Sequence, residues 1–347
     1  MTMIKSDIKS MLLSELETYF LSIGEPKFRA KQVFGWIHGG ASRFDEMLNI
    51  SKPLRQKLDA EFYINAPTLI TLSTSQANET TKFLWQMHDS ATIESVLMQY
   101  AYGNTVCISS QVGCAMGCAF CASAIGGLER NLNASEMLNQ VFFSQKESGK
   151  KISNVVIMGI GEPLDNFENV IRFLKLINHP AGLKMSLRKV TISTCGIIEN
   201  IDKLADYKIQ STLTVSLHAP DDETRSRLMP INRKYGVDRL LEACNRYFSK
   251  TGRRVSYEYS MIDGVNDTSA HAELLARKLK CSGSHVNIIP LSDVPERLLK
   301  GSSTEKIKAF LKILNHCNIN ATVRRSLGQD ISASCGQLRV RHIEKGS

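Results

Sequence analysis

Three cysteines, Cys114, Cys118 and Cys121, lie in a CxxxCxxC spacing within the stretch GCAMGCAFCASA. Iron–sulfur clusters are held by cysteine thiolates, and both these clusters and structural zinc sites normally take four protein ligands. Because no fourth Cys or His adjoins the three, one metal position would stay open for a substrate. This pattern favours a four-iron cluster with one free iron. A zinc ion completed by a distant Cys or His, and three unligated buried thiols, are the alternatives.

Length and composition favour a soluble intracellular enzyme. The 347 residues are 43% apolar, which is enough for one large domain and a small one. No apolar run approaches membrane-spanning length, and the first residues lack the apolar segment and cleavage site of a signal peptide. Nine cysteines, an odd number, are typical of a reducing cytoplasm rather than of a disulfide framework.

The charge balance points to a polyanionic partner. The formal net charge is +9. Since no basic helix lies beside an apolar span, nucleic acid fits this charge better than a membrane does. A charge kept only for solubility is the alternative.

From residue 104 onward, apolar β-branched runs alternate with amphipathic stretches. The runs cover residues 105–109, 152–158, 190–193, 213–217, 255–261 and 286–290, and helical stretches cover 133–149, 237–248 and 307–314. Six strand-and-helix units in series predict a parallel sheet with right-handed crossovers. Because a closed barrel has eight units, we expect an α/β fold with a partial (β/α)6 TIM-like barrel. Such a barrel keeps its chemistry at the carboxyl ends of its strands.

Candidate site residues follow the ends of these predicted strands. Each alone is compatible with ordinary turn chemistry, and a lone strand-end histidine is more often a satisfied structural residue than a ligand contact. Their convergence on one barrel mouth favours a site. They are the cysteine loop after the first run, residues 159–163 (GIGEP) after the second, Ser193 at the third, Ser216, Leu217 and His218 at the fourth, and Asn287 and Ser292 at the sixth.

Residues 1–90 predict a small N-terminal helical accessory domain with a hairpin lead-in, and residues 91–347 predict the core with a C-terminal segment. Pro26 begins a basic amphipathic helix, and a second helix carries Leu54 and Leu58. Helices with basic and apolar faces can contact phosphates; a solvated face over a packing stripe is the alternative. Residues 82–87 and 93–100 predict the hairpin.

The cysteine motif, with Phe120 before its last cysteine, resembles that of the radical S-adenosylmethionine (SAM) enzymes. Further stretches agree in order: CISSQVGCAMGCAFCASAIGGLERNL, MGIGEPLDN, VTISTCGI, VSLHAP, LMPIN, DGVND, NIIP and DISASCGQL. From about Glu25 through Leu338, the chain resembles the RlmN/Cfr family of radical SAM RNA methyltransferases. The resemblance implies methylation of an adenine carbon in 23S ribosomal RNA, at the peptidyl transferase centre, and in transfer RNA next to the anticodon. It also implies two cofactors, a [4Fe-4S] cluster on Cys114, Cys118 and Cys121, and SAM, used twice per turnover.

The resemblance assigns catalytic roles to three further residues. Cys335 would accept a methyl group from one SAM, and a radical made from a second SAM would activate that methyl so that it adds to the adenine. Cys107 would then attack the Cys335 sulfur, and the resulting disulfide would release the RNA. Glu94 would remove the proton from the substrate carbon. Without the resemblance, Glu94 would be taken for an exposed strand carboxylate.

Other positions match the family's SAM contacts. Where the family commonly has Asn after NIIP, this chain has a serine, which keeps a hydroxyl donor and acceptor on a shorter side chain. The matching residues are Gly161 and Glu162 for the SAM amino group, and Ser193, Ser216, Leu217, His218 and Ser292 for the rest of the site.

The family has two product types, methylated at C2 or at C8 of adenine. Pro163 in GEP and Val112 in QVGC agree with the C2 type, RlmN, rather than the resistance-conferring C8 type, Cfr. Alternatives from other classes are a radical SAM enzyme acting on a small molecule or peptide, and a non-catalytic RNA-binding protein with a structural metal. The presence of both Cys107 and Cys335 favours the RNA methyltransferase.

Expected partners are 23S rRNA, tRNA and a reducing electron donor such as flavodoxin or ferredoxin, with no membrane. We expect a cytoplasmic monomer. The resemblance gives no role to the remaining cysteines, of which Cys244 lies on an apolar stripe and is expected in the core. They are Cys195, Cys244, Cys281 and Cys317.

Overall fold

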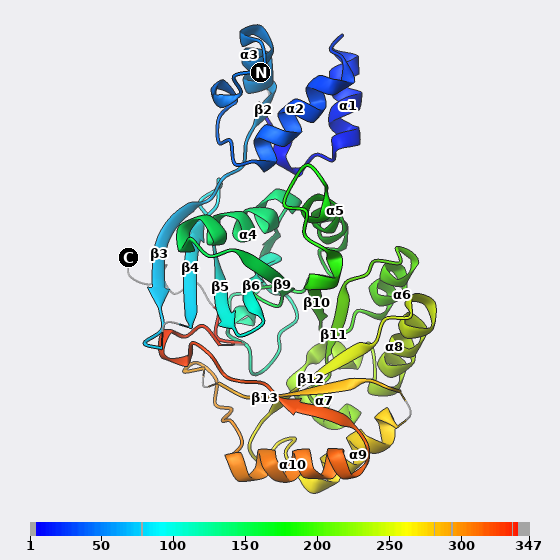
Figure 1. The fold of residues 1–347 in the computed structure, drawn as a ribbon. Coiled ribbons are helices and arrows are strands. Elements are labelled where there is room, and N and C mark those ends of the chain that lie inside the picture. Colours follow the sequence, from blue (N-terminus) through cyan, green and yellow to red (C-terminus); the bar gives the residue numbers. More distant parts are fainter. Residues whose placement is uncertain (1–4, 78, 281, 293, 335, 339–347) are drawn as a thin grey trace.

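The computed structural model describes residues 5–338 except residues 78, 281, 293 and 335. A ten-stranded sheet forms its centre (Figure 1). In chain order, the strands of this sheet are β3 (Thr68–Thr74), β4 (Thr80–Gln86), β5 (Thr92–Tyr100), β6 (Gly103–Ile108), β9 (Ile152–Ile157), β10 (Val190–Thr194), β11 (Thr212–Ser216), β12 (Val255–Met261), β13 (His285–Pro290) and β14 (Asn320–Val323).

The sheet has a parallel part and an antiparallel part, in the order β14-β13-β12-β11-β10-β9-β6-β5-β4-β3. Strands β6 and β9 through β14 pair in parallel. Strands β3 through β6 pair antiparallel. All six predicted strands are therefore confirmed in the parallel part, and the partial α/β barrel is confirmed with them.

Helices connect the parallel strands and lie around the outside of the sheet (Figure 1). This placement is what right-handed crossovers between parallel strands require. The connecting helices are α4 (Ala134–Ser148) after β6, α5 (Phe167–Asn178) after β9, α6 (Ile198–Asp206) after β10, α7 (Asp222–Leu228) and α8 (Val237–Thr251) after β11, α9 (Ser269–Leu279) after β12, and α10 (Thr304–His316) after β13.

Helix α4 begins and ends where its sequence signals predict. The side chain of Asn133 accepts a hydrogen bond from the backbone N–H of Glu136 at 2.9 Å, and the Glu136 carboxylate accepts one from the backbone N–H of Asn133 at 2.8 Å. This reciprocal pair is a capping box. At the other end, Gly149 has φ +65°, a left-handed conformation that glycine adopts readily.

The sequence analysis did not predict two strands of the sheet, β3 and β14. The hairpin of β4 and β5 is confirmed, but β3 precedes it and pairs with β4. Strand β3 lies at the sheet edge and keeps most of its side chains partly or fully exposed, so its sequence lacks the apolar pattern of a buried strand. Strand β14, at the opposite edge, is short and largely exposed as well. Strands β3 and β4 lie before residue 90 and yet belong to the core sheet.

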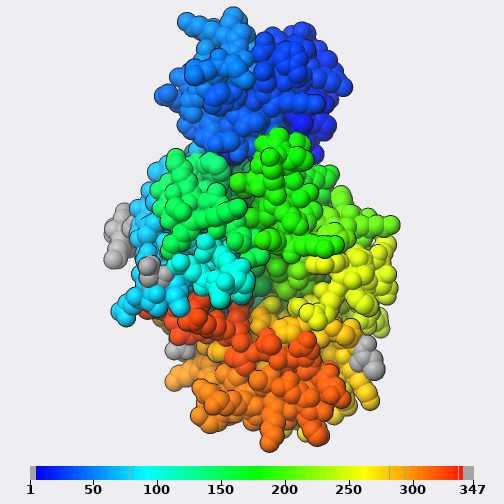
Figure 2. Space-filling view, viewed as in Figure 1, coloured from blue at the N-terminus to red at the C-terminus, as the bar shows by residue number. Residues whose placement is uncertain are grey.

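The N-terminal helices form a lobe at one end of the molecule, blue in Figure 2. They are α1 (Leu13–Ser22), α2 (Lys27–His38) and α3 (Lys52–Glu61). The lobe is anchored to the core by polar contacts: Ser135 Oγ on α4 donates to Asp7 Oδ2 at 2.6 Å, and Arg172 Nη1 on α5 donates to the Ser10 carbonyl at 3.2 Å. Lys9, buried at this junction, places Nζ 5.2 Å from the centre of the Phe142 ring. No helix in the described part of the chain is long and apolar enough to cross a membrane.

Buried His38 gives this junction a pH dependence. Burial, with help from the charges of Lys9 and His179, lowers the pKa of His38 from 6.5 to about 3. An unfolded chain takes up a proton at this residue below pH 6.5 and the folded chain does not, so stability that is complete above pH 6.5 is lost as the pH falls toward 3. Between pH 7 and pH 5 the loss from this one group is about 2 kcal/mol.

We therefore expect His38→Phe, which keeps a ring against Phe34, to remove this part of the acid sensitivity. Denaturant unfolding of the wild type and the variant at pH 7 and pH 5 measures it. From pH 7 to pH 5, the unfolding free energy of the wild type should fall by about 2 kcal/mol more than that of the variant. An unchanged difference would show that His38 is protonated in the folded protein.

Candidate active site

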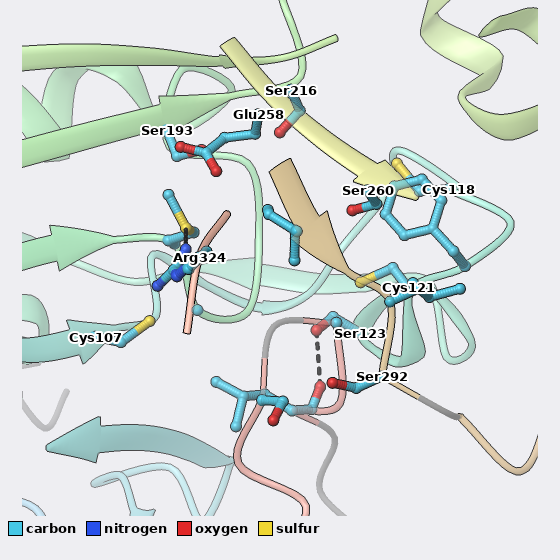
Figure 3. Close-up of a pocket in the computed structure, with 18 of the residues that line it drawn as sticks. Cys107, Cys118, Cys121, Ser123, Ser193, Ser216, Glu258, Ser260, Ser292 and Arg324 are labelled. Atoms are coloured by element: carbon cyan, nitrogen blue, oxygen red, sulfur yellow. Dashed lines mark hydrogen bonds between the residues drawn. The ribbon is translucent and has the colours of Figure 1, made fainter. Parts of the chain in front are cut away.

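One cavity lies at the carboxyl ends of the parallel strands. Its lining includes the loops after β9, β10, β11 and β13, and it continues along residues 324–338, called here the C-terminal segment. Figure 3 shows that side chains from distant parts of the sequence surround this space. Cys118 and Cys121 lie on one side, and Ser193, Ser216 and Glu258 lie on another. This is the edge at which such barrels keep their chemistry.

Most of the predicted site residues line this cavity. They are Cys114, Cys118 and Cys121 from the cysteine loop, Gly161, Glu162, Ser193, Ser216, His218 and Ser292 from the strand ends, and Cys107 from β6. Leu217 is not among the lining residues that the structure describes, because its side chain is fully buried in the core and its carbonyl accepts a hydrogen bond from Arg225 Nε at 3.0 Å. A contact between Leu217 and SAM stays a prediction.

The cysteine loop, residues 114–121, is held in place by backbone hydrogen bonds from three directions. The N–H of Cys114 donates to the Gly127 carbonyl at 2.8 Å, and that of Ala119 donates to the Leu228 carbonyl at the end of α7 at 2.9 Å. The N–H of Ala122, one residue past the loop, donates to the carbonyl of Gly336 in the C-terminal segment at 2.8 Å. The loop is therefore fixed to both the barrel and the C-terminal segment.

The environment of these thiols disfavours ionisation unless a cation is present. Burial raises the pKa of Cys114 to about 12. Burial also raises the pKa of Cys118, and the nearby Cys121 and Cys114 raise it further because thiolate charges repel one another. A metal cluster supplies the positive charge that thiolates need, so the donor set and its surroundings fit a cluster. In the described chain, no three His, Cys, Asp or Glu side chains are grouped so as to hold a single metal ion.

The two glycines of GIGEP allow their loop to pack directly on the end of β6 and on Gln111 just after it. A Cβ on Gly159 would lie 2.8 Å from the Ile108 carbonyl carbon, and one on Gly161, where φ is +102°, would lie 2.5 Å from Gln111 Cβ. Only glycine fits such a close approach at a positive φ. The buried Gln111 side chain accepts a hydrogen bond from the Glu162 N–H at 2.8 Å, so the QVGC stretch holds this loop.

Glu162 connects the loop after β9 to the end of β10. Its carboxylate accepts hydrogen bonds from Thr194 Oγ1 and the Cys195 N–H, both at 2.7 Å, and from the Leu164 N–H at 2.9 Å. Burial raises the pKa of this carboxyl group, while these donors oppose the rise. Because both carboxylate oxygens already accept hydrogen bonds from protein donors, the side chain fixes the shape of the cavity wall.

His218 is a neutral ring with one defined tautomer. Its Nδ1 accepts a hydrogen bond from the Ser260 N–H at 2.9 Å, which leaves the hydrogen on Nε2 as the donor that the ring offers. Burial lowers its pKa to about 3. The residue adopts φ +58°, and Asn266 holds that conformation by donating to the His218 carbonyl at 2.7 Å. Asn266 belongs to the DGVND stretch, whose place in the site is thereby explained.

Glu94 and Cys107 share one face of the antiparallel strands. Val96 on β5 pairs with Cys107 on β6 and lines the cavity, and Glu94 lies two positions along on the same face. The Glu94 carboxylate is 3.2 Å from Lys82 Nζ on β4, and Lys82 also donates to the carbonyl of Ser332 at 3.4 Å. Glu94 is buried, so the alternative of an exposed strand carboxylate is wrong.

The C-terminal segment covers these strands. Ala333 and Leu338 pack with Cys107, Val96 and Met98 in one apolar cluster. Cys335 lies outside the described residues, but Ser334 and Gly336 on either side of it line the cavity. No disulfide joins any of the described cysteines.

Comparisons with known proteins agree with this architecture. Residues 108–276 match the model of the radical SAM superfamily, and residues 6–64 match that of the ribosomal RNA large subunit methyltransferase N-terminal domain. A "probable dual-specificity RNA methyltransferase RlmN" of Lachnoclostridium phytofermentans is 48% identical over 98% of this chain and 96% of its own. One of Clostridium tetani is 45% identical, covering 98% of both chains. The chain belongs to the RlmN family.

A solved structure supports the same conclusion. The crystal structure of a radical SAM methyltransferase from Sphaerobacter thermophilus superposes with a TM-score of 0.91 at 43% identity, covering 96% of this chain and 99% of that one. Membership of the RlmN family implies a [4Fe-4S] cluster and SAM as cofactors. Cys114, Cys118 and Cys121 are the residues that fit the cluster here, because all three line the cavity.

The sequence missed charged residues in and behind the wall of this RlmN-family site. Glu258, in the middle of β12, lines the cavity and accepts a hydrogen bond from Asn287 Nδ2 at 2.8 Å. Burial raises its pKa, and the nearby Arg324 opposes that rise. The sequence did offer one sign of Glu258, because a carboxylate is unusual within an apolar run such as VSYEYSM. Lys82, which is half-buried beside Glu94, and Arg225, which is fully buried, carried no such signal, because charged residues on strand and helix patterns are usually solvated.

Proposed function

We propose that this RlmN-family protein transfers a methyl group from SAM to C2 of an adenine in 23S rRNA, and to the matching adenine of tRNA. One observation carries the proposal. The three cysteines of the loop, the GIGEP loop and Cys107 all line one cavity, and the residues flanking Cys335 line it too. Sulfur nucleophiles and a cluster site in one cavity suit a methylation in which the methyl group is first bound covalently to the enzyme.

We assign the following roles to residues of the chain. Cys114, Cys118 and Cys121 would hold the cluster, and Gly161, Glu162, Ser193, Ser216, His218 and Ser292 would form the surface for SAM. When bound, the cluster and SAM supply a 5′-deoxyadenosyl radical. His218 can offer SAM an Nε2 hydrogen, because Ser260 occupies its other ring nitrogen. The apolar side chains around Cys107 keep water away from reactive species.

An sp² C–H of adenine cannot attack the methyl group of SAM directly, so a sulfur must carry the carbon. In this proposal Cys335 would take a methyl group from a first SAM, a second SAM would supply the radical that removes a hydrogen from it, and the resulting methylene radical would add to C2. Glu94 would then take the C2 proton, and the unpaired electron of the adduct would leave to a one-electron acceptor such as the oxidised cluster, so that the ring becomes aromatic again. The Cys107 thiolate attacks the Cys335 sulfur, and the S–C bond breaks with its electron pair going to carbon, which is protonated to the methyl group. The disulfide is reduced by an external thiol before the next turnover.

We further propose that the chain divides near residue 65 into an RNA-contacting lobe and a catalytic core. The earlier division at residue 90 falls inside the core sheet, since β3 and β4 pair there. Exposed basic residues of the lobe would contact phosphates. They are Lys27, Lys31, Arg43, Lys52 and Lys57. We also propose a cytoplasmic monomer that receives electrons from flavodoxin or ferredoxin.

The product decides between C2 and C8 methylation. Pro163 and Val112 agree with the C2 type, and Val112 is buried next to Gln111, which holds the GIGEP loop. After anaerobic reaction with SAM and reductant, we expect digested ribosomal RNA to contain 2-methyladenosine by chromatography and mass spectrometry against standards. The same assay on tRNA tests the second substrate. The same reaction with Cys335→Ala is the control and should leave the RNA unmethylated. If 8-methyladenosine were the main product of the wild type, the proposal would be contradicted.

A further inference from the structure

The guanidinium of Arg225 is a fully buried positive charge in the described core, and its hydrogen bonds go to neutral oxygen atoms. Arg225 is on α7 and is 0% exposed. Nη2 donates to the Cys195 carbonyl at 2.7 Å and the Ser216 carbonyl at 3.1 Å, and Nε donates to the Leu217 carbonyl. Nη1 donates to Asn232 Oδ1 at 2.8 Å. None of these acceptors is a carboxylate.

The guanidinium group of Arg225, a planar fork of nitrogen donors, joins two of the loops that are proposed to bind SAM. Cys195 follows β10 and Ser216 ends β11, so one guanidinium group holds together the carboxyl ends of neighbouring strands. Cys195 in turn donates its N–H to Glu162 in the loop after β9. Three successive strand ends are therefore linked through Arg225, Cys195 and Glu162. A planar guanidinium can do this where an ammonium group, with a single nitrogen, cannot.

Arg225 also lies beside the cysteine loop. Leu228, one turn further along α7, accepts the hydrogen bond from the Ala119 N–H and packs with Cys118 and Phe120 in one apolar cluster. Cys195, whose carbonyl accepts the hydrogen bond from Arg225 Nη2, belongs to the same apolar cluster as Cys118, so the guanidinium lies directly behind the loop. Asp222, on the same helix, is joined to the guanidinium through the bridging side chain of Asn232 and attracts it through space, but no direct hydrogen bond links the two groups in the described structure.

A buried charge without a hydrogen-bonded counter-ion is costly, unless negative charge is supplied nearby. Three cluster thiolates would supply it, and the reduced cluster would supply more than the oxidised one. We infer that Arg225 is a positioning residue that sets the reduction potential of the cluster and aligns the strand ends that bind SAM. This inference rests on the proposed cluster and SAM site.

Two variants separate the charge of Arg225 from its shape. Arg225→Lys keeps the charge and loses the fork, while Arg225→Gln loses both and keeps amide donors for the buried carbonyls. Arg227→Gln, an exposed arginine on the same helix, is the matched control. The measurements are iron content, the midpoint potential of the cluster by EPR-monitored titration without RNA, and SAM affinity.

We expect the cluster of Arg225→Gln to be harder to reduce, with at least a tenfold lower ratio of reduced to oxidised cluster at a fixed potential, or about 59 mV for one electron. Arg225→Lys should keep nearly the wild-type potential, and both variants should bind SAM at least tenfold more weakly. If Arg225→Gln loses its iron and Arg225→Lys does not, that result also supports the charge effect, because only Arg225→Lys keeps the positive charge.

Equal potentials in all proteins, or loss of iron from both variants, would overturn the charge effect. Wild-type SAM affinity in both would overturn the positioning effect. Failure of the proposed function looks different, because the wild-type protein itself would then hold no cluster or would not cleave SAM. Arg227→Gln should match the wild type in every measurement, and a shift there equal to that of Arg225→Gln would also overturn the inference.

Discussion

Cys107→Ala protein is expected to purify with RNA covalently attached, and to complete no more than one turnover. In the proposed reaction the Cys107 thiolate releases the RNA from Cys335, so its removal should leave the earlier steps intact. The side chain is small, buried and packed against Val96 in the middle of the sheet, and alanine keeps the backbone pairing. Ribonuclease-sensitive retardation on denaturing gels and intact-mass spectrometry measure the adduct.

Three comparisons make this result decisive. The double variant with Cys335→Ala should carry no RNA, because the methyl acceptor is gone. Cys244→Ala removes another buried thiol, on α8 and outside the cavity lining, and should behave like the wild type. RNA-free Cys107→Ala protein with normal turnover would rule out the proposed division of labour between the two thiols.

Replacement of any one of Cys114, Cys118 and Cys121 by alanine is expected to abolish both the cluster and SAM cleavage. Each would supply one iron ligand, and the surroundings hold no spare thiolate at the spacing of the motif. Loss should be complete within detection rather than graded, since a cluster with two protein ligands is not retained. Iron and sulfide counts after anaerobic reconstitution, with chromatography of 5′-deoxyadenosine, give the two readouts.

Cys195→Ala is the sharpest control, because Cys195 lines the same cavity and is also buried. Its backbone N–H binds Glu162 and its carbonyl binds Arg225, and these two hydrogen bonds survive the substitution although the thiol contact with Glu162 is lost. We expect it to keep its iron. A cysteine-loop variant with a full cluster and normal activity would remove that residue from the ligand set.

The sequence predicted those features that rest on local signals. Strands buried on both faces require continuous apolar runs, and each of the six runs became a parallel strand. The capping box at Asn133 and Glu136 gave the start of α4 because the bonds that make it span only three residues. The cysteine loop and GIGEP were found because metal ligation and close backbone approach demand particular residue types at fixed spacing.

Long-range polar contacts could not be predicted in this way. Arg225 occurs in DETRSRL, which has the composition of a solvated helix, yet it is fully buried by contacts with β10 and β11. Lys82 on β4 meets Glu94 on the neighbouring strand β5, and it also meets Ser332, which is distant in sequence but lies in the segment that covers these strands. A single sequence reports charge but not burial, so such residues are assigned to the surface by default. The edge strand β3 was missed for the opposite reason, because an exposed strand needs no apolar pattern.

The position of Cys107 constrains how the proposed disulfide with Cys335 could form. Its strand is paired on both sides, with Val96 on β5 and Val156 on β9, so its backbone is as immobile as any in the sheet. Two sulfurs must approach to about 2 Å to bond. The described residues of the C-terminal segment, held at Gly336 and Leu338 by hydrogen bonds from Ala122 and Ser123 just after the cysteine loop, take part in no strand pairing. If the proposed disulfide forms, the approach of the two sulfurs would therefore depend on movement of the C-terminal segment rather than of β6.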